Sequence, residues 1–208
     1  MPETGDDLER DPEARAAHLE QQKAAWQETI DDMEAMAEAR EDEGWETLTV
    51  TALDGAPKDS ETDDQDRHGL VFVVPDNQAD DLEAAVEAGE FPRYQVYRAE
   101  RSGEVFLVIE YLDPDTETAI YVAGTFELRF AQGMVREGRE EEATYTHYQT
   151  LDTTPVGSFR HDGAEAVEKF VPHADDIDNW IRDVDRGAEP PESEAPDDLS
   201  DADPDERS

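Results

Sequence analysis

The sequence predicts an α+β fold in which helices cover a mostly antiparallel sheet of about six to seven strands. Two observations lead to this fold class. Short runs of apolar, β-branched and aromatic residues are separated by turn signals, and longer stretches carry apolar residues at helical spacing. The clearest runs lie between Tyr94 and Ala123, and we expect them to form a three-strand meander at the centre of the sheet.

A long helix is predicted to begin the domain, after an N-terminus that we expect to be disordered over residues 1–10. Asp11 and Pro12 suit the N-cap and the first position of a helix, and Gly44 suits its end. The apolar residues on one face of this helix span barely three heptads. Packing on the sheet is therefore favoured over a coiled coil. The residues of this face are Leu19, Trp26, Ile30, Met33 and Ala37.

The next segment reads as strand, loop, strand and helix. Residues 45–53 alternate between apolar and polar and predict a half-buried strand. Residues 54–67 are acidic and without periodicity, so we expect a mobile hairpin loop there. Residues 70–74 are apolar on both faces, and a helix is then expected from a cap at Asp76 or Asn77 to Gly89.

The meander follows, with strands expected at residues 94–97, 105–109 and 119–122. Ser102-Gly103 suits a tight turn, and Asp113-Pro114 suits the first two positions of a type I turn. The middle run is apolar on both pleat faces, which predicts a central strand that is covered on both sides.

The C-terminal part is less regular. Residues 125–142 fit a strand or a helix, and we expect a helix although Gly133 and Gly138 count against it. Two short strands are expected at 145–151 and 156–159, and a last helix is predicted from Ile177, Trp180, Ile181 and Val184. Residues 11–187 are therefore expected to form one domain, followed by a disordered acidic tail at 188–208.

The charge of the chain is its most unusual property. It has 57 acidic residues and 17 basic ones, of which three are lysines, and its formal net charge is -40. Such self-repulsion is mostly screened in molar salt, where the Debye length is about 3 Å. The composition therefore predicts a halophilic protein. Cysteine is absent, the N-terminus is polar, and no apolar run could span a bilayer, so we expect a soluble cytoplasmic protein without membrane contact.

Three local patterns resemble those of a known group. They are Gly44-Trp45-Glu46-Thr47-Leu48 at the end of the first helix, the hairpin from Tyr94-Gln95-Val96-Tyr97-Arg98-Ala99 to Val105-Phe106-Leu107, and Tyr145-Thr146-His147 with Thr150-Leu151. Together they resemble an uncharacterised family of small haloarchaeal proteins over roughly residues 20–165. The family has no assigned activity, so the resemblance implies no functional residues.

Catalytic fingerprints are missing from the sequence, and no catalytic residue is predicted. His147, His161 and His173 are weak candidates for a metal site, but their spacing matches no compact ligand motif, so neither a metal nor another cofactor is expected. Glu110 lies in an apolar run, where a desolvated carboxylate could act as an acid or base; pairing with an arginine is the favoured alternative.

Arginines gather between residues 93 and 139. Candidates for an anion site are Arg98, Arg101, Arg129, Arg136 and Arg139. Guanidinium groups suit phosphate or carboxylate, but ion pairing within such an acidic protein is favoured over a shared site. Nucleic-acid binding is disfavoured because phosphate contacts weaken steeply in salt.

We therefore interpret the chain as a non-catalytic binding or interaction module of a halophilic cytoplasm. Its partner would be a second copy of the chain or another protein. The contact surface would be an uncovered part of the face bearing Leu19, Trp26 and Ile30, or an unpaired sheet edge. The alternatives are a small-molecule or metal-dependent enzyme and a nucleic-acid-linked regulator that uses the arginine cluster.

Overall fold

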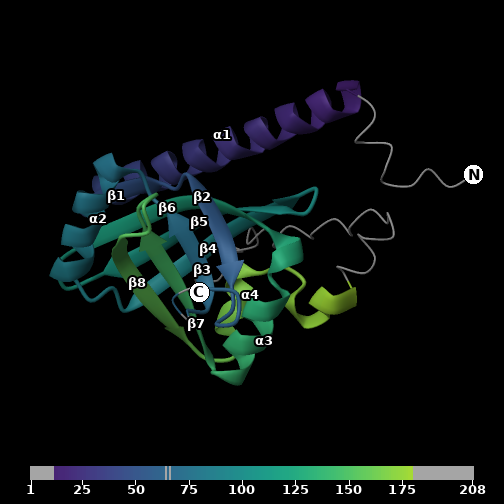
Figure 1. The fold of residues 1–208 in the computed structure, drawn as a ribbon. Helices are drawn as coiled ribbons and strands as arrows, with labels where there is room; N and C mark the ends of the chain where they lie inside the picture. Colours follow the sequence, from purple (N-terminus) through teal and green to yellow (C-terminus); the bar gives the residue numbers. More distant parts are fainter. Residues whose placement is uncertain (1–11, 64, 66, 180–208) are drawn as a thin grey trace, which may run out of the picture.

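The computed structural model describes residues 12–63, 65 and 67–179, which form eight strands in two sheets with helices around them (Figure 1). The first sheet has the order β1-β6-β5-β4 and the second β2-β3-β7-β8. The first sheet contains β1 (Glu46–Thr51), β4 (Arg93–Arg101), β5 (Glu104–Asp113) and β6 (Thr118–Glu127). The second contains β2 (Asp54–Lys58), β3 (Gly69–Val73), β7 (Ala143–Gln149) and β8 (Pro155–Asp162).

The α+β class is confirmed, but the prediction of one mostly antiparallel sheet was wrong. Both sheets are mixed, because β1 pairs parallel with β6 and β3 pairs parallel with β7. These two pairings join strands that are far apart in the sequence. As a result the strands form two separate sheets in place of the expected single one.

The meander β4-β5-β6 is confirmed, and its turns form as their residues suggest. Ser102 and Gly103 both have positive φ, 54° and 81°, as a two-residue hairpin turn of type I′ requires. At the second turn the Asp113 carboxylate accepts a hydrogen bond from the backbone N–H of Asp115 at 3.0 Å.

Strand β5 is buried on both faces because it lies between two apolar layers. Val105, Leu107 and Ile109 face the core between the two sheets. Val108 and Leu112 face the opposite way and pack beneath the first helix. The continuous apolar run of the sequence therefore reflects cover on both sides, as predicted.

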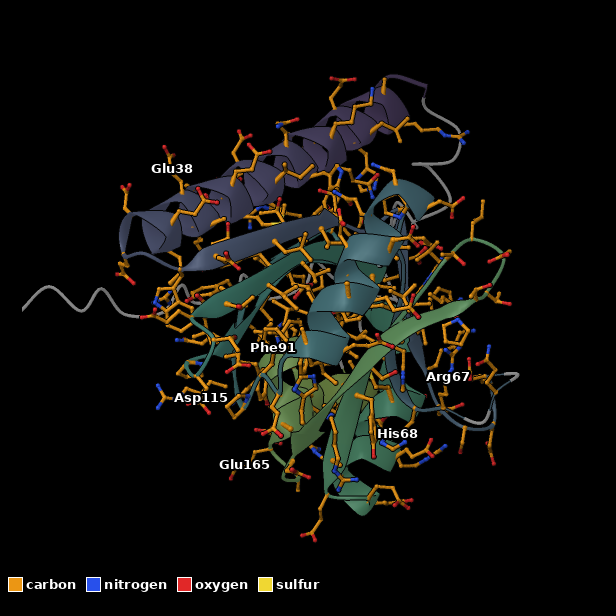
Figure 2. The ribbon with its side chains drawn as sticks, turned by 90° about the vertical axis from the view of Figure 1, so that its left-hand side faces the viewer. Glu38, Arg67, His68, Phe91, Asp115 and Glu165 are labelled. Carbon is orange, nitrogen blue, oxygen red and sulfur yellow. The ribbon has the colours of Figure 1, made fainter. Side chains whose placement is uncertain are left out.

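Helix α1 (Pro12–Asp42) lies across the outer face of the first sheet, with Glu38 pointing away from the sheets (Figure 2). Met33 and Ala37 are buried against the sheet and Trp26 is partly buried, whereas Leu19 is 49% exposed. The C-terminal half of the predicted apolar face is therefore the part that packs against the sheet. The predicted cap at Asp11 lies outside the described residues.

The acidic stretch is not only a loop, so the prediction for residues 54–67 was wrong in its first part. Asp54–Lys58 is strand β2, which pairs antiparallel with β3. A Cβ placed at Gly55 would lie 2.2 Å from the carbonyl oxygen of Thr125, so glycine allows β2 to pack closely on β6. The glycine and the proline that suggested a loop are compatible with a strand at a sheet edge.

Helix α2 (Asp76–Ala88) has the predicted extent and buries Leu82. Its predicted cap was wrong: Pro75 occupies the N-cap position, and no side chain caps the helix there. The helix packs against β8 and β1 (Figure 2).

The ambiguous stretch at 125–142 is part strand and part helix. Strand β6 continues to Glu127, a short η1 (Leu128–Phe130) follows, and helix α3 is Gln132–Glu140. The helix prediction was therefore wrong for residues 125–127, where Phe126 is buried as part of a strand.

Two short helical segments lie near the end of the described chain, α4 (Ala166–Phe170) and η2 (Ala174–Asp176), and residues 177–179 after them are also helical. Ile177 is buried, but Trp180, Ile181 and Val184 of the predicted last helix lie outside the described residues. The predictions for residues 1–10 and 188–208 lie outside them too. Within the described part of the chain, no helix has the length and apolar character needed to cross a membrane.

Candidate functional site

A groove runs between α1 and the edge strand β4 on the outer face of the first sheet. It exists because α1 packs over β1, β6 and β5, while β4 lies beyond the helix at the sheet edge. The groove has a volume of about 440 Å³. Its lining is mostly apolar and includes Ala35, Met36 and Ala39 from α1 and Tyr97, Ala99 and Val108 from the sheet.

Tyr97 is the most prominent side chain of this groove. It is 43% exposed although it is a large aromatic residue on a strand. Burial of part of the ring raises the pKa of the Tyr97 hydroxyl, and the nearby charge of Glu110 adds to this rise. Tyr97 therefore has one edge in solvent and its hydroxyl close to a buried carboxylate.

Glu110 is the centre of a polar network beneath α1. It is 2% exposed, and its Oε1 accepts hydrogen bonds from Arg40 Nη2 at 2.8 Å and from the Tyr121 hydroxyl at 2.7 Å. Burial and the bond to Glu110 raise the pKa of Tyr121 to about 12. Arg40 also lies over the ring of Trp45, 5.3 Å from its centroid. The network ties the C-terminal end of α1 to the sheet.

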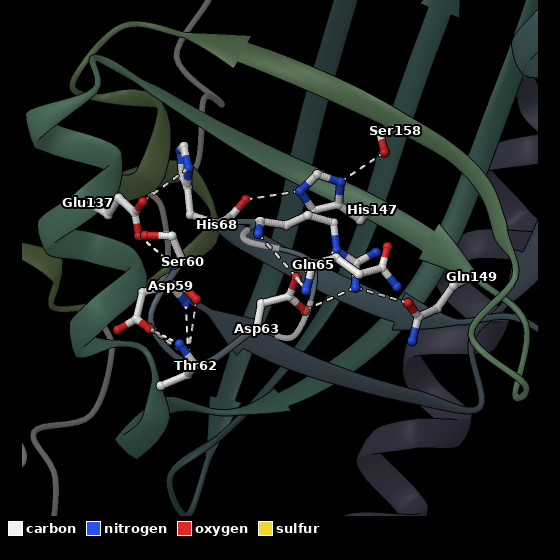
Figure 3. Close-up of polar contacts among 11 residues, drawn as sticks. Asp59, Ser60, Thr62, Asp63, Gln65, His68, Glu137, His147, Gln149 and Ser158 are labelled. Carbon is white, nitrogen blue, oxygen red and sulfur yellow. Dashed lines mark hydrogen bonds and ion pairs between the residues drawn. The ribbon is translucent and has the colours of Figure 1, made fainter.

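A second polar cluster lies on the outer face of the second sheet, where the β2–β3 loop approaches α3 and β7 (Figure 3). The Arg67 side chain donates two hydrogen bonds to Asp63 and one to Gln149, and its bonds to Asp63 lower the pKa of Asp63 to about 2. Glu137 of α3 accepts a bond from the backbone N–H of Ser60 at 2.8 Å. These contacts hold the loop that the sequence predicted to be mobile.

His147 sits at the edge of this cluster between two oxygen atoms (Figure 3). Its Nε2 is 3.0 Å from the carbonyl oxygen of His68, and its Nδ1 is 2.8 Å from Ser158 Oγ. The ring is 8% exposed, and burial lowers the pKa of His147.

The structure does not bring the three candidate histidines together. His161 lies in the core between the sheets, with Nε2 3.1 Å from Thr146 Oγ1. His173 lies near β4, with Nε2 2.9 Å from Glu100 Oε2. Among the residues that the structure describes, no group of three or more His, Asp or Glu side chains could hold a metal ion.

Acid is expected to destabilise the protein through His161. Burial lowers the pKa of His161 to about 3, so below pH 6.5 the unfolded chain takes up a proton that the folded protein does not. Above pH 6.5 the ring is neutral in both states, so the free energy of unfolding does not depend on pH through His161. Below pH 6.5 the free energy of unfolding falls by about 1.4 kcal/mol per pH unit. Denaturant unfolding between about pH 6 and about pH 4.5 measures this slope.

The His161→Gln variant should show a shallower slope than the wild-type protein over the same range. Thr146→Val is the control, because it removes the hydrogen bond to the ring but keeps the imidazole. It should lower the stability without flattening the slope. Equal slopes for wild type and His161→Gln would contradict the assignment.

The five arginine candidates all contact groups of the protein itself. Each lies beside an acid or a backbone carbonyl: Arg98 donates to the carbonyls of Glu168 and Lys169, Arg101 to that of Glu100, Arg129 contacts Glu127, Arg136 contacts Asp59, and Arg139 contacts Glu168 and Asp175. Arg98 and Arg139 both contact Glu168 of α4.

Sequence reasoning missed three residues that belong to these sites. Arg40 was not singled out, although a basic residue in the last turn of a helix is a recognisable signal. Tyr97 shares its face of β4 with Gln95 and Ala99, and that alternation could have marked it as a residue of the outer face. Ser158 carried no signal in the sequence.

Comparison with known proteins gives one match. A model of a family of unknown function, DUF7529, matches residues 12–172. No curated protein and no solved structure matches the chain.

Proposed function

The chain belongs to the DUF7529 family of unknown function, and on that premise we propose that it is a non-catalytic interaction module of a haloarchaeal cytoplasm. It holds an extended segment of a protein partner along β4 and in the groove between β4 and α1. The partner is a second copy of the chain or another protein.

The observation that carries this proposal is the groove beside an unpaired strand edge. Among the described residues, no strand pairs with the outer edge of β4, which is nine residues long. An unpaired edge can accept a strand, and the alternate side chains of that strand then enter neighbouring pockets. The groove next to β4 offers Met36, Tyr97 and Val108 as an apolar floor for such side chains.

The net charge of -40 supports binding through this surface. At molar salt, long-range attraction between charges is screened, whereas apolar burial and short-range hydrogen bonds persist. A groove lined mostly by alanine, methionine and aromatic side chains is suited to these conditions. It is also consistent with a halophilic host, which the low lysine content and the excess of acids favour.

Photo-crosslinking tests the proposal. A photoreactive amino acid placed at Ala99, which is exposed and lines the groove, should cross-link to a polypeptide in cells. The mass of the product distinguishes a second copy of the chain from another protein. Ala39→Glu adds a charge to the opposite wall of the groove and should abolish the cross-link without unfolding the domain, since Ala39 is exposed.

Ala24→Glu is the matched control, because Ala24 is an exposed alanine of the same helix that does not line the groove. The purified complex of the chain with its partner should also persist when the KCl concentration is raised to about 3 M. Loss of the cross-linked partner as KCl rises, or equal cross-linking with Ala39→Glu, would contradict binding in the apolar groove.

A further inference from the structure

A pair of side chains on the second sheet has a chemistry that the groove does not use. His147 of β7 and Ser158 of β8 are direct cross-strand neighbours, and both lie on the outer face of the sheet. The sequence gives no hint of the pair, because the register of two strands brings its members together.

The hydrogen bonds of His147 define its tautomer. The carbonyl oxygen of His68 can only accept a hydrogen bond, so the Nε2 atom 3.0 Å away must carry the proton. In the neutral ring Nδ1 is then bare, and it accepts the proton of the Ser158 hydroxyl at 2.8 Å. Among the described residues, no donor bonds to the Ser158 hydroxyl oxygen, and its own proton points at the imidazole.

The surroundings keep the base neutral and the serine accessible. His147 is almost fully buried, and its ring lies parallel to that of Tyr145, with the centroids 5.5 Å apart. Ser158 is exposed. The titratable and charged groups on this side are Arg67 and Asp63, which pair with each other, and His68 and Glu137, whose Nδ1 and Oε1 atoms are 3.7 Å apart.

Separately from the groove, we propose that Ser158 is a nucleophile activated by His147 and that activated esters acylate it once, which is a covalent modification and not a catalytic turnover. In this step Ser158 Oγ forms a bond to the acyl carbon, and the bond from that carbon to the leaving group breaks. The hydroxyl proton passes to His147 Nδ1 and from there to the departing alkoxide. The His68 carbonyl stabilises the imidazolium by accepting a hydrogen bond from Nε2–H, which also orients the ring for the transfer.

A fluorophosphonate probe tests the proposal on the full-length protein. Ser158 Oγ would form a bond to phosphorus as fluoride leaves, and the proton would pass to His147. We expect one label per chain, located at Ser158 by peptide mass spectrometry and absent from Ser158→Ala. Ser102 is the internal comparison, since it is an exposed serine in the β4–β5 turn and has no histidine beside it in the strand register.

His147→Gln should lower the labelling rate by about 100-fold, the usual contribution of a positioned general base. The wild-type rate should begin to fall at a lower pH than it would with an ordinary histidine, because burial lowers the pKa of His147. The pH profile needs no variant, so it decides the question even if His147→Gln does not fold. Equal labelling of Ser102 and Ser158 would overturn the proposal. So would a labelling rate whose pH dependence is that of a histidine with an ordinary pKa.

Discussion

Raising the KCl concentration from about 0.1 M to about 3 M is expected to increase the Tm of this protein by about 10 °C or more. The reason is the charge of -40, which opposes the folded state by self-repulsion when it is not screened. Thermal unfolding followed by circular dichroism at a series of KCl concentrations measures the effect.

Salt also strengthens apolar burial, and a non-ionic osmolyte separates the two causes. Sucrose favours burial without screening charges, so it should raise the Tm much less than KCl does at equal osmolality. Screening should produce most of its rise in Tm below about 1 M KCl, because at that concentration the Debye length has already fallen to about 3 Å. A Tm that does not change with KCl would contradict the halophilic interpretation.

Replacing Arg40 by methionine is expected to destabilise the protein by about 3 kcal/mol. The change leaves Glu110 as a buried carboxylate, with only the Tyr121 hydroxyl as a donor to Oε1. Its second oxygen, Oε2, is buried and has no hydrogen-bond partner among the described residues. Urea unfolding of the variant and the wild-type protein measures the difference.

The matched control is Arg129→Met, which removes an exposed arginine from its pair with Glu127. That loss should be below about 1 kcal/mol, because exposed ion pairs contribute little. The double variant Arg40→Met/Glu110→Gln should recover part of the stability by removing the buried charge. An effect of Arg40→Met no larger than that of Arg129→Met would mean that the buried pair does not hold α1 in place.

The sequence predicts this fold well wherever the decisive contacts are local. The turn at Ser102-Gly103 and the extent of α1 depend on neighbouring residues, and both were predicted correctly. The division into two sheets depends on β1 finding β6 and β3 finding β7, which no local pattern specifies. Strand β2 was missed because Gly55 and Pro57 disfavour strands in general, while this strand lies at an edge.

The candidate sites follow the same rule. Glu110 was recognised as unusual because a carboxylate in an apolar run is a local observation, but Arg40 comes from a distant helix. His147 and Ser158 meet only through the register of β7 and β8. The groove depends on where α1 crosses the sheet, which is decided by the packing of Met33 and Ala37 and not by the residues that line the groove.

The two parallel pairings also determine when the protein can fold during its synthesis. Glu46 pairs with Thr118 and Leu70 pairs with Thr146, so neither sheet can be completed while only the first half of the chain has left the ribosome. Until β6 emerges, the apolar face of α1 has no sheet to cover. Pairing strands so far apart costs loop-closure entropy before any contact is gained, and such folds form slowly. We therefore expect that neither sheet is complete until late in synthesis: the first requires β6 and the second requires β8.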